Sequence, residues 1–70
     1  MRIEGRTFIV TGGGNGIGRE VVLGLLARRA GVAALDLREE GLAETTRLAG
    51  TAAASRLTTY AVNVTDRARV

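Results

Sequence analysis

The sequence predicts an α/β fold, in which a doubly wound parallel sheet is built from a β-α-β-α-β unit. Short runs rich in apolar and β-branched residues alternate with segments of helical periodicity along the 70 residues. The runs at 8–10 and 32–35 are continuously apolar, as is typical of parallel strands covered on both faces. Five glycines between positions 12 and 18 separate the first run from the first helical segment. Together these observations favour parallel strands joined by right-handed helical crossovers.

The first strand and the first helix are expected on either side of these glycines. Residues 7–11 are all β-branched or aromatic, and they favour extended backbone. Residues 17–30 have the 3.6-residue period of an amphipathic helix. Its apolar stripe consists of Val21, Val22, Leu25 and Leu26, and the charged positions expected to face water are Arg19, Glu20, Arg28 and Arg29. Gly31 stands where the residue that ends this helix is expected.

The remaining elements follow the same alternation. A second strand is expected over 32–35 and ends at Asp36, and a second helix over 38–49 ends at Gly50. The stripe of that helix consists of Leu42, Thr45, Thr46 and Ala49. Residues 51–56 are expected to form a connecting loop, although their alanines could also extend the helix. A third strand is expected over 57–62, and Thr65 and Asp66 are expected to start a further helix.

The composition excludes several classes of function. Cys, His and Lys are all absent, so the ten basic residues are Arg, and the net charge is +3. Disulfides, thiolate or imidazole metal sites and lysine-dependent chemistry are therefore excluded within these residues, and no metal site is expected. Phe8 and Tyr60 are the only aromatic residues, so nucleic-acid binding by base stacking is not expected. Since no run approaches the ~20 apolar residues of a membrane span and no signal peptide is evident, we expect a cytoplasmic protein without a membrane partner.

The glycine-rich segment has the sequence context of a phosphate-binding loop. It follows an expected strand and opens an expected helix, whose N-terminal N–H groups attract a pyrophosphate. The alternative is a glycine-rich turn that binds nothing, but five glycines cost more backbone entropy than a simple turn requires. A Walker loop is excluded because Lys is absent, and the spacing G-x-G-x-x-G is also absent. The glycines at 12, 16 and 18 instead have the spacing G-x-x-x-G-x-G.

With Thr11 before it, this spacing resembles the cofactor loop of the classical short-chain dehydrogenases/reductases, and the resemblance covers essentially the whole chain. It implies a Rossmann-like fold and an NAD(P)-dependent oxidoreductase. It also implies that residues 1–70 are the incomplete N-terminal half of a dinucleotide-binding domain. The loop residues expected to bind the cofactor are Gly12, Gly14, Asn15, Gly16, Ile17 and Gly18. Among them, Gly18 would let the helix pack closely on the strand.

Two further places along the chain support the resemblance. Asp36, at the end of the second strand, can accept hydrogen bonds from the adenosine ribose hydroxyls and repel a 2′-phosphate, which favours NAD over NADP. Leu37 follows it in the expected cofactor site, and Arg38 is the complication, because an arginine there can hold a 2′-phosphate. After the third strand, Asn63 stands where the family usually has Asp beside the adenine, and Val64 follows it. The alternatives are a solvated strand-end carboxylate at Asp36 and a helix cap at Asn63.

No catalytic residue is assigned. The family's reaction resembles proton transfer by a Tyr with a Lys four residues on, together with a Ser and an Asn. Here Tyr60 is the only Tyr, and the residue four positions later is Val64. The chain is therefore expected to carry the NAD-binding part of a dehydrogenase and not its catalytic part. The alternatives are a stand-alone adenine-nucleotide-binding module and an inactive truncated remnant.

The predicted sheet is incomplete in a way that has structural consequences. In the doubly wound order the first strand is central, so with three strands it is left as an exposed apolar edge. One face of the sheet is also expected to lack a covering helix. The resemblance implies that the full-length protein is a homo-oligomer.

Overall fold

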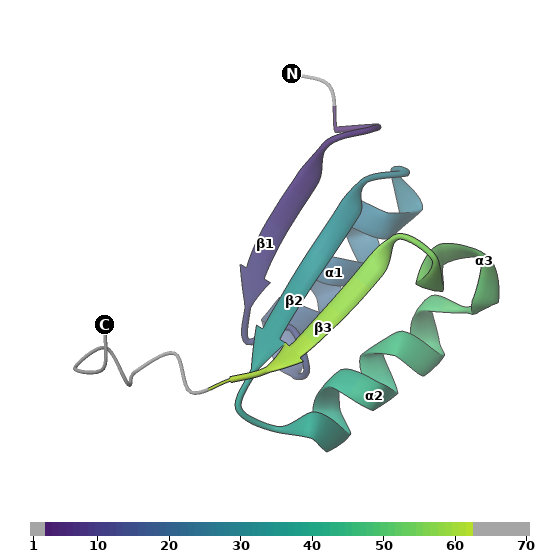
Figure 1. Cartoon of the computed structure of the whole chain (residues 1–70). Coiled ribbons are helices and arrows are strands. Elements are labelled where there is room, and N and C mark those ends of the chain that lie inside the picture. Colours follow the sequence, from purple (N-terminus) through teal and green to yellow (C-terminus); the bar gives the residue numbers. More distant parts are fainter. Residues whose placement is uncertain (1–2, 63–70) are drawn as a thin grey trace.

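The computed structural model of the chain describes residues 3–62. The elements follow in the order β1 (Thr7–Thr11), α1 (Gly16–Ala27), β2 (Gly31–Asp36), α2 (Glu39–Ala49), α3 (Thr51–Ala54) and β3 (Leu57–Ala61). The three strands form one parallel sheet in the order β1-β2-β3, with β2 in the centre (Figure 1). The predicted α/β class and the β-α-β-α-β order are confirmed, and the expected helix that starts at Thr65 lies outside the described residues.

The hydrophobic core lies between one face of the sheet and the helices α1 and α2. Its buried members come from α1, β2 and α2: Val22, Leu26, Val32, Ala34 and Leu42. Both helices therefore cover the same face, with α1 behind the sheet in Figure 1. The predicted stripe of α1 is correct at Val22 and Leu26, whereas Val21 is 44% exposed.

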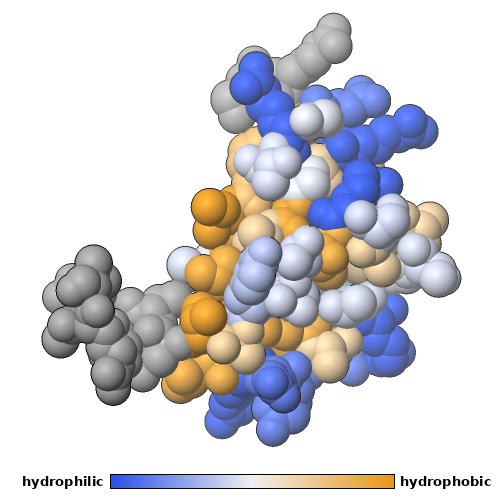
Figure 2. Space-filling view, in the orientation of Figure 1, coloured by the Kyte–Doolittle hydropathy of each residue, from blue (hydrophilic) through white to orange (hydrophobic). Residues whose placement is uncertain are grey.

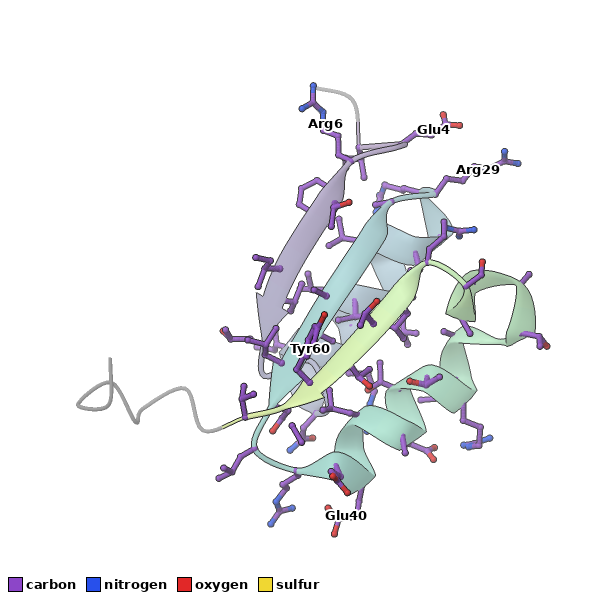
Figure 3. The ribbon with its side chains drawn as sticks, viewed as in Figure 1. Glu4, Arg6, Arg29, Glu40 and Tyr60 are labelled. Carbon is purple, nitrogen blue, oxygen red and sulfur yellow. The ribbon has the colours of Figure 1, made fainter. Side chains whose placement is uncertain are left out.

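The opposite face of the sheet carries no helix among the described residues. Side chains alternate between the faces of a strand, so the register that pairs Ile9 with Ala33 places both on this open face. Ile9 is 73% exposed on the edge strand β1, and Tyr60 of β3 is half exposed and stands out from the sheet in Figure 3. Figure 2 shows hydrophobic residues gathered on the β1 side of this view. The apolar runs of the strands thus suit a sheet with helices on both faces, whereas among the described residues helices cover one face.

The end of α1 differs from the prediction. The helix ends at Ala27 rather than at position 30, and Gly31 belongs to β2. Arg29 takes the left-handed conformation, with φ 66°. The N–H of Ala30 donates to the Leu25 carbonyl, and the N–H of Arg29 donates to the Leu26 carbonyl. This pattern is a Schellman motif, in which an arginine occupies the position that glycine usually takes.

The end of α2 follows the prediction, but the segment after it does not. Gly50 ends α2 with φ 87°. The expected loop over 51–56 contains the short helix α3, in which the Ala54 N–H donates to the Gly50 carbonyl over 3.0 Å. The alanines thus form a separate turn of helix, because the left-handed backbone at Gly50 interrupts the helix before them.

Candidate functional site

The candidate site is an open cleft at the carboxyl ends of β1 and β2. Its volume is about 1160 Å³, and it is lined by the glycine loop (residues 12–15) and by the segment that leads from the end of β2 into α2. Ligands of open α/β sheets bind at this edge of the sheet. Glu40, near the start of α2, lies at this end of the molecule, whereas Glu4, Arg6 and Arg29 lie at the opposite end (Figure 3).

The glycine loop continues the chain of β1 across the end of the sheet. The N–H groups of Gly12 and Gly13 both donate to the Leu35 carbonyl of β2, over 2.6 and 3.1 Å. Gly12 has φ +73°, a conformation that side chains disfavour, and a Cβ there would meet no protein atom within 4 Å. Its exposed side therefore faces open space at the cleft, where a ligand can approach the backbone.

Gly18 allows the start of α1 to pack on the loop. A Cβ at Gly18 would lie 2.6 Å from the Gly12 carbonyl carbon, which is closer than Cβ atoms approach other atoms. Position 18 thus requires glycine, as predicted, because the start of α1 packs against the backbone directly after β1. Any larger residue would push the start of α1 away from the Gly12 backbone.

The N-terminus of α1 presents unpaired N–H groups. The first intrahelical bond runs from the Arg19 N–H to the Asn15 carbonyl, so the N–H groups of residues 16–18 precede the helical ladder. Asn15 is the N-cap, and its side chain makes no capping hydrogen bond. The first turn of α1 contains no acidic residue. N–H groups at a helix start and the positive end of a helix dipole attract anions.

Asp36 faces the loop from the end of β2. Its Oδ2 accepts from the Gly14 N–H over 2.9 Å, and its Oδ1 accepts from the Arg38 N–H over 3.2 Å. The hydrogen bonds from the Arg38 and Gly14 backbone lower the pKa of the Asp36 carboxyl below its ordinary value, against a smaller opposing effect of burial. A fixed negative charge therefore stands opposite the open helix terminus of α1.

The structure brings most of the predicted site residues together. The cleft is lined by Gly12, Gly14, Asn15, Gly16, Asp36 and Leu37. Ile17 is 83% exposed at the start of α1 and Leu37 is 68% exposed, so both apolar side chains are open to solvent beside the cleft. Asn63 and Val64 lie outside the described residues. Arg38 also lines the cleft.

Sequence reasoning missed four residues of the cleft: Arg19, Glu39, Glu40 and Gly41. The expectation that Arg19 faces water is wrong, because its guanidinium bonds to the Gly14 and Gly41 carbonyls. Its position in an amphipathic pattern gave no sign of this contact. Thr45 is the residue that could have indicated this contact, because it is a polar residue in the apolar stripe of α2. Its side chain is fully buried, and a buried hydroxyl requires hydrogen-bond partners.

The described part of the chain contains neither a cluster of metal-ligating side chains nor a membrane-spanning helix. Over residues 3–62, no group of three or more acidic, Cys or His side chains could hold a metal ion. Over the same residues, no helix has the length and apolar character needed to cross a membrane.

The chain is similar to known dehydrogenases. It matches the family model of the short chain dehydrogenase over residues 6–70. Cis-1,2-dihydrobenzene-1,2-diol dehydrogenase of Pseudomonas putida is 46% identical over 52 residues, which are 74% of this chain and 19% of that enzyme. A short chain dehydrogenase from Mycobacterium paratuberculosis bound to NAD has a TM-score of 0.82 and 28% identity, over 99% of this chain and 30% of the other. For carveol dehydrogenase from Mycobacterium avium in complex with NAD, the TM-score is 0.81 and the identity 27%, over 93% and 27% of the two chains.

The family model covers the glycine loop, the sheet and both long helices of this chain. The chain spans less than a third of the length of each of these relatives, between 19% and 30%. The resemblance predicted from the glycine spacing is confirmed, and so is the Rossmann-like arrangement of its strands and helices. The chain belongs to the short-chain dehydrogenase family.

Proposed function

We propose that residues 1–70 carry the NAD-binding part of a short-chain dehydrogenase and contain none of its catalytic residues. The observation that carries the proposal is the pairing of two features across one cleft. Unpaired N–H groups at the start of α1 suit a pyrophosphate, and the ionised Asp36 suits the ribose hydroxyls of an adenosine. Both relatives of known structure described above hold NAD.

The residues of the cleft fit the two ends of the adenosine diphosphate group. The backbone of Gly12, Gly16, Ile17 and Gly18 would hold the pyrophosphate, and the side chain of Asp36 would accept from the ribose. When bound, the nicotinamide end of the cofactor supplies the hydride chemistry of such enzymes. Leu37 and Asn15 flank the site, and we propose Asn63 and Val64 as the continuation of the adenine side.

We propose NAD rather than NADP as the cofactor. Asp36 is held by two backbone N–H groups, and a 2′-phosphate would bring negative charge onto this carboxylate. Arg38 is the counter-argument, because it lines the same cleft and could neutralise a phosphate. Measured affinities for NAD and NADP decide between these two arguments. If Asp36 sets the preference, NAD binds more tightly than NADP.

A binding module without chemistry is the second candidate. The specific observation in its favour is that the N–H groups at the start of α1 and the Asp36 carboxylate suit the binding of a nucleotide without any catalytic group. Among residues 3–62, the structural features that suit a nucleotide lie between residues 12 and 38. Such a module would bind NAD, ADP and AMP without turning any of them over. In either case we expect a cytoplasmic protein, and for the complete enzyme a homo-oligomer.

The test begins with the intact mass of the natural gene product, measured by mass spectrometry in its source cell. A mass several times larger than 7.3 kDa would support the dehydrogenase, and a mass equal to it would support the binding module. Thermal melts of that product with and without NAD, NADP and AMP then test the site, because a ligand of the native state raises the midpoint. A cooperative melt that none of the three nucleotides shifts would refute both candidates.

A further inference from the structure

Three hydrogen bonds from one arginine join the glycine loop to α2. The Nε of Arg19 donates to the Thr45 hydroxyl over 3.0 Å. Its Nη2 donates to the Gly14 carbonyl over 2.7 Å and to the Gly41 carbonyl over 3.2 Å. Arg19 belongs to α1, so its side chain connects three parts of the chain that are separated in sequence.

Thr45 completes this connection from inside the protein. Its side chain is fully buried, and its hydroxyl lies 2.9 Å from the Gly13 carbonyl and 3.0 Å from the Gly41 carbonyl. The hydroxyl has one proton, which it donates to one of these two oxygens, while its lone pair accepts from Arg19. We call Arg19, Thr45 and Gly41, with these bonds, the loop latch.

The loop latch and Asp36 fix the same peptide group from opposite sides. The carbonyl of Gly13 faces Thr45, and the N–H of Gly14, in the same peptide plane, donates to Asp36. The next carbonyl, that of Gly14, faces Arg19. With both carbonyls held toward α2, the loop has one conformation, and the open N–H groups that follow it at the start of α1 have one direction.

Close backbone packing makes this geometry possible. A Cβ at Gly14 would lie 2.8 Å from the Leu42 nitrogen and 2.9 Å from the Gly41 carbonyl carbon. A Cβ at Gly41 would likewise collide with the Gly14 carbonyl oxygen. Only a pair of glycines lets α2 approach the loop closely enough for Thr45 to reach Gly13.

We infer that Thr45 and Arg19 are positioning residues that hold the glycine loop in the conformation that receives the pyrophosphate. The inference rests on the proposed function, because it assigns the loop to a nucleotide. Thr45 does not line the cleft, so a change there reaches the ligand only through the loop. Preorganised backbone donors bind better than donors that must first be ordered.

The test compares two neighbouring threonines of α2 in the natural gene product that contains these residues. Thr45→Val removes the hydroxyl that bonds to the loop. Thr46→Val is the matched control, because the Thr46 hydroxyl makes the same type of bond to a carbonyl four residues back, that of Leu42 at 3.0 Å, but does not contact the loop. Thr45→Ser keeps the hydroxyl and is the rescue variant.

Two readouts separate positioning from general stability. The affinity for ADP, which contains the pyrophosphate, is compared with the affinity for adenosine, which lacks it. We expect Thr45→Val to weaken ADP binding by about fivefold or more, and to change adenosine binding by less than about twofold. Amide hydrogen exchange at Gly14 should accelerate by a similar or larger factor. Thr46→Val and Thr45→Ser should match the wild-type protein in both measurements.

The inference is overturned if Thr45→Val and Thr46→Val change ADP binding and Gly14 exchange equally. If the wild-type protein binds neither ADP nor adenosine, the proposed function fails, and the exchange at Gly14 still decides whether the loop latch orders the loop. Should Thr45→Val fail to fold, Arg19→Met replaces it, with Arg28→Met at the exposed end of α1 as its control. Equal Gly14 exchange in these two variants also overturns the inference.

Discussion

Gly41→Ala should destabilise the protein, although the same change in a helix usually does the opposite. Replacing glycine by alanine inside a helix stabilises it by about 0.5–1 kcal/mol, because alanine loses less backbone entropy on folding. At Gly41 the new Cβ would collide with the Gly14 carbonyl oxygen and lie 3.1 Å from the carbonyl carbon. Overpacking of this kind costs about 1–3 kcal/mol. We therefore expect a net loss of about 1 kcal/mol.

Gly24→Ala in α1 is the matched control. A Cβ there would meet only the end of the Arg28 side chain, at 3.7 Å, so the variant should gain the usual ~0.5–1 kcal/mol. The free energy of unfolding, measured by urea denaturation of wild type and both variants, gives the two signs directly. If Gly41→Ala stabilises the protein as much as Gly24→Ala does, the close contact between α2 and the glycine loop is wrong.

Three further predictions concern Asp36 and Arg29. Asp36→Ala should weaken NAD binding by about 1–3 kcal/mol and reduce the preference over NADP, as measured by calorimetric titration of both nucleotides; an unchanged ratio of affinities removes Asp36 from the site. Because its folded pKa is lowered, the stabilisation by Asp36 is complete above pH ~4 and is lost as the pH falls through the folded value. The unfolding free energy of wild type should therefore fall more steeply below pH ~4 than that of Asp36→Asn, and parallel curves would contradict this. Arg29→Gly should stabilise the protein by about 1 kcal/mol in thermal unfolding, because glycine adopts its φ of 66° without strain; a lower melting temperature would count against the Schellman motif.

The strands, the long helices and the cleft could be predicted because local patterns specify them. The glycine spacing at 12, 16 and 18 follows β1, and Asp36 is the last residue of β2. Parallel strands bring their carboxyl ends to one edge of the sheet. Periodicity likewise identified Leu42 and Thr45 as inward-facing positions of α2. None of these inferences required knowledge of contacts between distant residues.

The contacts that the sequence did not reveal are those between elements. Arg19 has the pattern of a surface residue, and its partners on the glycine loop and α2 are up to 26 positions away. The end of α1 was misplaced because Gly31 is a usual helix terminator, whereas Arg29 takes the left-handed conformation at an energetic cost. Gly41 has no local signature, since its role depends on the backbone of Gly14 opposite it.

The hydrogen bond between the Asp36 carboxylate and the Gly14 N–H has a consequence for engineering cofactor preference. The group that would select the ribose also holds the backbone that precedes the phosphate site. A redesign that removes the carboxylate to admit a 2′-phosphate therefore leaves the Gly14 N–H without its acceptor. Cofactor preference and the conformation of the glycine loop then change together. The better starting substitutions are Ser or Asn, which remove the charge but retain an oxygen that can accept from Gly14.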